Sequence, residues 1–302
     1  MTQNNVQLQD GNGQLAGLRN IIINGAMQIW QRGVGQTGIV GYGSCDRFRT
    51  SHATVSITRT SPSSESFPSP YACDVTPTDG SEFITSVELP IGSRQQPLVV
   101  GSTWTLSFYT DSIEGITGYF EFRDDSNLLG TGVMVDTYGE ADLIPGETIG
   151  SLTRYSYTFT IGATALASNI CMKVAFGGPA SGWSRIFSCV QLEPGVVATP
   201  FEIRANGLEQ ALCERYYQQS PWYLSGGQGY AGEVISQNRS MLTTMRAQPA
   251  TTINVGSTTG AMTATDASVD ASEKDYLIKT TAFSQLNVNG TAIGGVTFDA
   301  EL

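Results

Sequence analysis

The side chains that could carry acid–base or nucleophilic chemistry are few in this sequence. His52 is the single histidine among 302 residues. A Ser-His-Asp or Cys-His arrangement would have to use it, and a zinc site built on histidines would need a second one. The chain contains no G-x-S-x-G, and "GGQG" (226–229) lacks the Lys and the following Ser or Thr of a phosphate-binding loop. We therefore interpret His52 as an ordinary strand or strand-edge residue.

Acidic residues are more numerous, but their spacing does not single out a pair. A glycosidase needs two carboxylates that face each other across the substrate. The candidates are Glu121, Asp124, Asp125 and Asp136. The segment "EFRDDSN" (121–127) is typical of a strand that ends in a turn. Because catalysis needs a positioned constellation and none is visible, we predict a protein without enzymatic activity.

The cysteines are scattered and form no C-x-x-C pair. The five are Cys45, Cys73, Cys171, Cys189 and Cys213. Zinc sites and disulfide frameworks both need closer, patterned spacing. We therefore expect buried free thiols and no metal site built from them.

The charge balance argues against several classes of partner. Lys and Arg number 16 against 27 Asp and Glu, which gives a net charge of −11. Nucleic-acid binding depends on clustered cations at the phosphates, and no basic run is dense enough. No stretch approaches the roughly 20 consecutive apolar residues of a membrane span, and residues 1–14 lack the pattern of a secretory signal. We expect no nucleic-acid partner, no membrane insertion, and synthesis in a cytoplasm.

The elements that would position any site are mostly short strands. Apolar residues alternate with polar ones over 103–109, 154–161 and 170–176. One dry face and one wet face per strand is typical of antiparallel sheets that pack face to face. The side chains expected to point inward are Trp104, Leu106, Phe108, Tyr157, Phe159, Met172 and Val174. The Ser/Pro/Gly-rich segments 60–70 and 142–151 are expected to be loops.

One helix interrupts this all-β pattern. Asn206 suits an N-cap, Glu209 suits the acidic position of a capping box, and Pro221 would end the helix. The predicted organisation is an arm (1–19), a β-sandwich domain (20–205), a connecting helix (206–220) and a β-rich domain (221–302). The last part is small for a core of its own, so partner subunits would supply burial unless it docks on the first domain. The helix residues expected at such an interface are Leu208, Leu212 and Tyr216.

Several aromatic residues lie beside Gly-rich segments. Exposed aromatic rings near polar loops can stack on the apolar faces of sugars. The candidates for glycan binding are Trp183, Trp222, Tyr223 and Tyr230. For each of them, packing in a core or an interface is the alternative.

Six segments form an ordered set along nearly the whole chain. They are "LRNIIINGAMQIWQRG" (18–33), "GYGSCDRF" (41–48), "VQLEPGVVATPFEIR" (190–204), "QALCERYY" (210–217), "TTMRAQP" (243–249) and "FDAEL" (298–302). This set resembles a family of bacteriophage tail-fibre and related virion proteins. The resemblance implies a jelly-roll first domain similar to carbohydrate-binding modules, followed by a helix and a β-rich C-terminal domain. It also implies a homotrimer on the virion that takes part in attachment to the host surface.

Two functions stay open under this resemblance. The protein is either a fibre that binds host surface glycan or a structural decoration, such as a head fibre, that contacts only virion proteins. Residues 1–19 would dock on other virion proteins in both cases. The net charge of −11 favours a neutral or cationic glycan. No cofactor is expected, although the resemblance leaves room for a structural calcium, which such modules often carry. Asn24 and Glu193 lie in the two segments where that ion would bind, but neither segment has a dedicated loop of acids.

Overall fold

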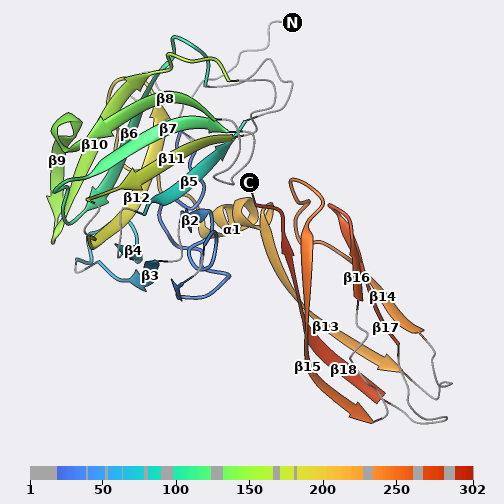
Figure 1. Cartoon of the computed structure of the whole chain (residues 1–302). Coiled ribbons are helices and arrows are strands. Elements are labelled where there is room, and N and C mark those ends of the chain that lie inside the picture. Colours follow the sequence, from blue (N-terminus) through green and yellow to red (C-terminus); the bar gives the residue numbers. More distant parts are fainter. Residues whose placement is uncertain are drawn as a thin grey trace, which may run out of the picture. The chain divides into compact units, whose positions relative to one another are not determined.

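The computed structural model describes residues 19–38, 40–51, 54–62, 64–77, 81–89, 98–123, 132–165, 171–179, 182–226, 234–260, 268–281 and 290–301. The chain divides into two compact units, with the boundary between Glu209 and Gln210 (Figure 1). The all-β class predicted from the sequence is confirmed, since strands make up both units and the helical part is short. Within the described ranges, no helix is long and apolar enough to cross a membrane.

The first unit is a jelly-roll sandwich of two antiparallel sheets. Its strands are β1 (Gly35–Thr37), β2 (Phe48–Thr50), β3 (Val55–Thr60), β4 (Ala72–Pro77), β5 (Phe83–Glu88), β6 (Thr103–Thr110), β7 (Thr117–Arg123), β8 (Gly132–Gly139), β9 (Ile144–Ile149), β10 (Leu152–Thr160), β11 (Cys171–Gly177) and β12 (Arg185–Pro194). The seven-stranded sheet has the order β1-β3-β4-β12-β6-β10-β9, and the five-stranded sheet has the order β2-β5-β11-β7-β8. A 3₁₀ turn, η1 (Glu140–Asp142), lies between β8 and β9.

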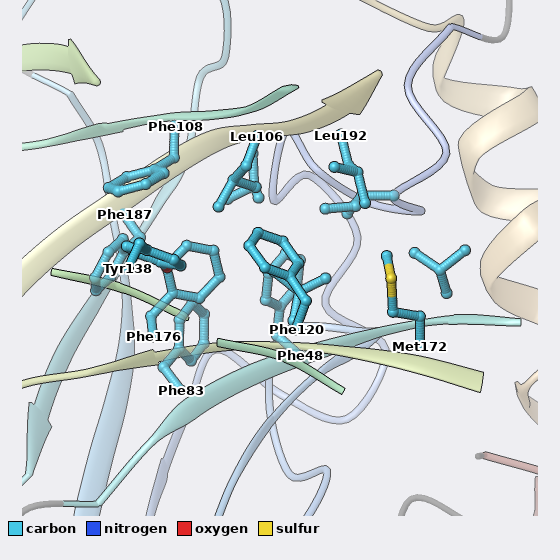
Figure 2. Packing of buried hydrophobic residues seen from close by; sticks show 14 of the residues in the cluster. Phe48, Phe83, Leu106, Phe108, Phe120, Tyr138, Met172, Phe176, Phe187 and Leu192 are labelled. Atoms are coloured by element: carbon cyan, nitrogen blue, oxygen red, sulfur yellow. The ribbon is translucent and has the colours of Figure 1, made fainter. Parts of the chain in front are cut away.

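Aromatic and aliphatic side chains from both sheets meet in the space between them (Figure 2). Phe83 stacks on Phe48 and Phe187 with ring centroids 5.0 and 5.5 Å apart, and Phe108 meets Phe176 edge to face at 5.2 Å. The inward positions predicted from alternation are confirmed for six buried residues: Trp104, Leu106, Phe108, Phe159, Met172 and Val174. Tyr157 is half-buried and packs against the same core. The two-sheet sandwich therefore has the expected strand phase.

On two strands, the face that points away from the core is buried, although it was expected to be exposed to solvent. Thr105 and Ser107 on β6 are buried, as are Lys173 and Ala175 on β11. On β6, the reason is a chain segment that follows β12 and returns across the outer face of the sheet. The Thr105 hydroxyl donates to the Gly195 carbonyl of that segment, and Arg154 donates to the Ser107 hydroxyl, so burial does not require apolar side chains there.

One segment expected to be a loop is a strand. β9 forms the exposed edge of the seven-stranded sheet and pairs with β10, with Ile149 opposite Leu152. Pro145 lies in β9, which is compatible with an edge strand because an edge leaves some backbone N–H groups outside the ladder. The polar composition of β9 therefore reflects its place at the edge rather than the absence of strand structure.

The second unit contains two three-stranded antiparallel sheets. Its strands are β13 (Tyr217–Gly226), β14 (Val234–Ser240), β15 (Ala250–Gly260), β16 (Ser268–Ala271), β17 (Asp275–Thr281) and β18 (Gly290–Asp299). The sheet orders are β13-β18-β15 and β14-β17-β16. A small core joins them, in which the Tyr276 and Phe298 rings lie 4.7 Å apart. Its buried members are Met245, Tyr276, Ile278, Val296, Phe298 and Ala300.

The helix is shorter than predicted. It is α1 (Asn206–Glu214), and Pro221, the expected stop, lies inside β13 instead. The chain leaves the helix because β13 pairs with β18 from Tyr217 opposite Asp299 onward. Glu209 was expected to close a capping box, but its carboxylate accepts hydrogen bonds from the Asn24 amide and from Arg204. Long-range contacts therefore determine both where the helix ends and which groups bind the Glu209 carboxylate.

Candidate functional site

The segment after β12, residues 195–204, is called the strap because it crosses the outer face of the seven-stranded sheet. It begins at Gly195, whose φ of 111° lies in a region that favours glycine. The Gly195 amide donates to the Thr103 carbonyl at 2.9 Å, which directs the chain back over β6. Phe201 then packs beside Tyr109 and Cys189 on this face. The sequence "EPGVVATPF" therefore encodes a reversal that covers the sheet.

A buried carboxylate fixes the strap to the strand that precedes it. Glu193 accepts hydrogen bonds from the Thr199 amide at 2.8 Å and from the Thr199 hydroxyl at 2.5 Å. Gln191 Nε2 donates to the same carboxylate at 2.8 Å. The Gln191 side-chain oxygen accepts from the Glu202 amide at 2.8 Å, which holds the strap at a second point. The strap is thus held by polar groups of β12.

Arg154 on β10 connects the strap with the middle of the sheet. Its guanidinium Nη2 donates to the Ser107 hydroxyl at 2.8 Å and to the Thr199 carbonyl. The side chain is buried although it carries a charge. Because a buried cation must keep its hydrogen bonds, Arg154 has a fixed position at the base of the strap.

Next to Arg154, a tyrosine and a glutamate form a second polar contact. The Tyr109 hydroxyl donates to Glu147 on β9. Burial is the main cause that raises the pKa of Tyr109 above its ordinary value, and the hydrogen bond to Glu147 acts in the same direction. Tyr109 therefore stays a neutral donor at physiological pH, which holds the exposed Glu147 carboxylate in place.

Glu147 and Arg154 border an open groove of about 500 Å³ between the strap and the edge of the sheet. We call it the strap groove. Its lining comes from β9 and β10 and from the strap: Gly146, Glu147, Arg154, Tyr155, Ser156, Val196, Val197, Ala198 and Pro200. Val196 and Val197 are 69% and 56% exposed, so the strap wall offers apolar surface to solvent. Apolar surface beside a few fixed polar groups is typical of a small-ligand site.

None of the aromatic residues predicted to bind glycan is among the described residues that line this groove. Trp183 is buried beside Phe187, with the Arg185 guanidinium 4.8 Å from its ring centroid, so it takes the alternative role of core packing. Tyr223 lies on β13 and is 51% exposed. Trp222 belongs to the same strand, but its side chain lies outside the described part of the chain, as does the whole of Tyr230.

The residues expected at an oligomer interface differ in exposure. Leu208 is 45% exposed on α1. Leu212 is half-buried. Tyr216 is buried within its own chain just after the helix, and its carbonyl accepts a hydrogen bond from the Ala300 amide. The shared helical face therefore does not continue to Tyr216, because the helix has already ended.

The carboxylates considered for catalysis have other partners where they are described. Glu121 forms an ion pair with Arg123 at 3.3 Å, and Asp136 accepts a hydrogen bond from the Tyr157 hydroxyl at 3.1 Å. His52, Asp124 and Asp125 lie outside the described residues. The five cysteines are free and buried, as predicted.

The two residues considered for calcium do not fit that ion. Asn24 Oδ1 accepts from the Gln28 and Ile29 amides at 2.9 and 3.0 Å, and the Glu193 carboxylate is occupied by Thr199 and Gln191. Calcium needs six to eight oxygen ligands that are free to coordinate it. Within the described ranges, no group of three or more His, Cys, Asp or Glu residues could hold a metal ion.

Sequence reasoning did not find Glu147, Arg154 or the strap. One usable signal was the Pro194–Gly195 step directly after a strand, since this step is typical of a sharp turn. A second was the single cation, Arg154, at the start of an alternating run. Neither signal indicates which strand the returning segment will cover.

Comparison with known proteins gives a similarity of fold only. No protein-family model and no curated protein matches the chain. Among solved structures, it is similar to the enzymatically active domain of tailspike protein 4 from bacteriophage CBA120, with 11% identity and a TM-score of 0.39 over 60% of this chain and 22% of that one. It is also similar to TmCBM61 in complex with β-1,4-galactotriose, with 15% identity and a TM-score of 0.30 over 59% of this chain and 99% of that one. The N-terminal cellulose-binding domain of Cellulomonas fimi β-1,4-glucanase C matches at 16% identity and a TM-score of 0.28, over 55% and 98% of the two chains. At these values the likeness does not assign a function.

Proposed function

We propose that this chain is a non-enzymatic bacteriophage virion fibre protein that attaches to host surface glycan through the strap groove. The observation that carries the glycan part is the composition of the groove, where the Glu147 carboxylate and the Ser156 hydroxyl lie opposite two exposed valines. The resemblance of the six sequence segments to virion fibre proteins supports the virion part. The localisation that follows is the virion, after synthesis in the host cytoplasm.

A sugar ring matches the two walls of this groove. The C–H face of a pyranose is apolar and would pack on Val196, Val197 and Pro200. Its hydroxyl groups would donate to Glu147 and exchange hydrogen bonds with Ser156. Because Tyr109 and the sheet fix these polar groups before the ligand arrives, little conformational entropy is lost on binding.

The lining residues favour binding over cleavage. Glycoside hydrolysis normally uses two carboxyl groups on opposite sides of the scissile bond. The groove lining contains one carboxylate, Glu147, and its partner is a tyrosine hydroxyl. This arrangement supports a binding site that leaves the glycan intact.

The proposal includes a homotrimer, whose residues 1–19 contact other virion proteins. Its support is the small core of the second unit, where six residues are buried among the described ones. Three grooves on one particle component would also bind a repeating polysaccharide with avidity. Native mass spectrometry should therefore give three times the chain mass of 32.2 kDa. A monomer at micromolar concentration would contradict the trimer.

The glycan function is tested by blocking the groove. Val197→Arg places a long charged side chain on the strap wall, and Val40→Arg is the matched control, because the two valines are 56% and 59% exposed. The control lies next to β1, at the opposite edge of the sheet from β9. In a binding assay with purified host surface polysaccharide, Val197→Arg should weaken binding at least about tenfold, or about 1.4 kcal/mol.

Three results have distinct meanings. Loss of binding in Val197→Arg but not in Val40→Arg supports the groove. Equal binding by both variants and the unmodified protein would place the glycan site elsewhere. Failure of the folded, unmodified protein to bind would refute the glycan function and favour the structural decoration, which contacts virion proteins alone.

A further inference from the structure

The outer face of the five-stranded sheet is enclosed and yet carries charged side chains. Arg49 on β2, Ser86 on β5 and Lys173 on β11 are 6%, 4% and 2% exposed. Their neighbours in the alternation, such as Phe48 and Val174, point into the core, so these three residues share the opposite face. In the register of the sheet, Lys173 lies opposite Ser86. Arg49 lies opposite Ile84, two residues before Ser86 on the same strand.

Two cations on this face, Lys173 and Arg123, are paired with the carboxylates of Glu82 and Glu121. Lys173 Nζ donates to Glu82 Oε2 at 3.1 Å and to the Tyr119 hydroxyl, and Tyr119 donates to the same Glu82 oxygen at 2.9 Å. Burial is the main cause that lowers the pKa of Lys173, and Glu82 opposes this effect. Lys173 and Arg49 lie near each other, because Lys173 is opposite Ser86 and Arg49 is opposite Ile84 on the same strand, and the positive charge of Arg49 also lowers the Lys173 pKa.

A third cation, Arg49, forms no ion pair with the residues that the structure describes. Its Nε is buried without a partner, while its two Nη groups are not enclosed and remain available to a ligand. The Ser86 hydroxyl, on the same face, is also buried without a partner. A buried donor without an acceptor is unfavourable, so the Arg49 Nε and the Ser86 hydroxyl are suited to receive an anion.

We infer that Arg49 and Ser86 form a binding site for a small oxyanion, either the carboxylate of an acidic sugar or a phosphate group. The planar guanidinium donates two parallel hydrogen bonds to either group, and a serine hydroxyl adds a third donor. Lys173 on the neighbouring strand is paired with Glu82, so the donors of this site are those of Arg49 and Ser86. Such a site would let a protein with a net charge of −11 hold a small anion through hydrogen bonds from Arg49 and Ser86.

This site lies on the sheet opposite to the strap groove and is independent of the proposed glycan function. The test uses the full chain and three probes at constant ionic strength: sodium glucuronate, inorganic phosphate, and glucose as a neutral control. Calorimetric titration gives the affinity, and the melting midpoint of the first unit is measured with and without each probe. Arg49→Gln is the main variant, and Arg59→Gln is the control, because Arg59 lies over the Tyr71 ring on the other sheet, 4.5 Å from its centroid.

For the unmodified protein, we expect saturable binding of glucuronate or phosphate but not of glucose. A probe at about ten times its Kd should raise the melting midpoint by about 3–5 °C. The anion that binds, glucuronate or phosphate, shows whether the site takes an acidic sugar or a phosphate group. Arg49→Gln should weaken that binding at least about tenfold, since a charge-assisted pair is lost. Arg59→Gln and the groove variant Val197→Arg should bind the anion as the unmodified protein does.

The behaviour of Arg49→Gln without any anion provides a second criterion. Because the substitution removes a buried donor that has no acceptor and a cation that no described carboxylate pairs, its melting midpoint should equal or exceed that of the unmodified protein. If Arg49→Gln fails to fold, that result itself contradicts the inference, and Ser86→Ala then measures whether any anion binding depends on this face. Failure of both anions to bind the unmodified protein, or equal binding by Arg49→Gln, would also overturn it. Neither result would affect the groove, which is judged with the polysaccharide.

Discussion

Replacing Glu193 with alanine should loosen the strap, because this buried side chain fixes Thr199 to β12, beside the second link through Gln191. Glu193 is 0% exposed, and its carboxylate accepts three hydrogen bonds, two of them from Thr199 and one from Gln191. In Glu193→Ala, the Thr199 amide loses its acceptor at a position that is 2% exposed. The perturbation therefore removes hydrogen bonds and leaves a buried donor without a partner.

The magnitude follows from these contacts. A hydrogen bond to a charged group contributes about 1.5–3 kcal/mol, and a buried donor left alone costs about 1–3 kcal/mol. The three bonds share one acceptor group, so their contributions are not additive. Removing a buried carboxylate also recovers part of its desolvation penalty. We expect the free energy of unfolding to fall by about 3–5 kcal/mol in Glu193→Ala, and by about 1–2 kcal/mol in Glu193→Gln, which keeps one acceptor oxygen.

Urea denaturation of the first unit measures this difference, and amide hydrogen exchange at Thr199 locates it. Glu65→Ala is the control, because Glu65 is an exposed glutamate in the loop between β3 and β4. Its effect should stay within about 0.5 kcal/mol. Faster exchange at Thr199 in Glu193→Ala, together with weaker glycan binding, would show that the strap forms one wall of the groove.

The reasoning would be refuted if Glu193→Ala lost less than about 1 kcal/mol and left the exchange of Thr199 unchanged. In that case the strap would be held mainly by its apolar contacts. Phe201→Ala would then be the more damaging substitution, since Phe201 packs on the cluster around Tyr109.

Three further predictions concern the sandwich. Phe159→Ala should lower the free energy of unfolding by about 3–5 kcal/mol, because Phe159 is stacked on Phe120 with centroids 3.9 Å apart; an unchanged melting temperature would contradict the strand phase. Burial, followed by the hydrogen bond to Asp136, raises the pKa of Tyr157 from 10.0 to about 12, so stability is fully present below pH 10.0 and falls as the pH rises toward 12. Alkaline denaturation of Tyr157→Phe should show a smaller fall, and an identical pH profile would exclude Tyr157 as a cause. Burial raises the pKa of Cys189 to about 12, so this thiol should resist a thiol reagent at pH 8 until the protein unfolds; rapid labelling of Cys189 in the native state would contradict its burial.

The inward side of each strand could be predicted from the sequence alone. Side chains alternate between the two faces of a strand, so a run such as Trp104, Leu106 and Phe108 fixes which face is buried without knowledge of the neighbouring strands. The same local logic correctly assigned the cysteines to buried positions as free thiols. The jelly-roll sandwich, with one helix and a β-rich second part, follows from these patterns together with the resemblance.

The outer faces could not be predicted in this way, because what covers a face comes from elsewhere in the chain. Lys173 occupies a position that alternation assigns to solvent, but Glu82 reaches it from 91 residues away. Arg154 depends on Thr199, which is 45 residues away and lies on a segment that reads as a loop. An alternating pattern describes one strand at a time, and it gives no information about a distant segment that covers that strand.

The end of the helix and the candidate site were likewise decided by tertiary structure. Pro221 is a sound local stop signal, but the pairing of Tyr217 with Asp299, 82 residues later, draws the chain into a strand first. Composition and alternation determined that this protein is an acidic, all-β sandwich with a known inward phase. Which polar residues meet in the strap groove, and which cation on the opposite sheet is left without an acceptor, depended on contacts between distant segments. Such contacts form only when the sheets assemble, because each residue's local sequence constrains its own backbone but not the identity of its distant neighbours.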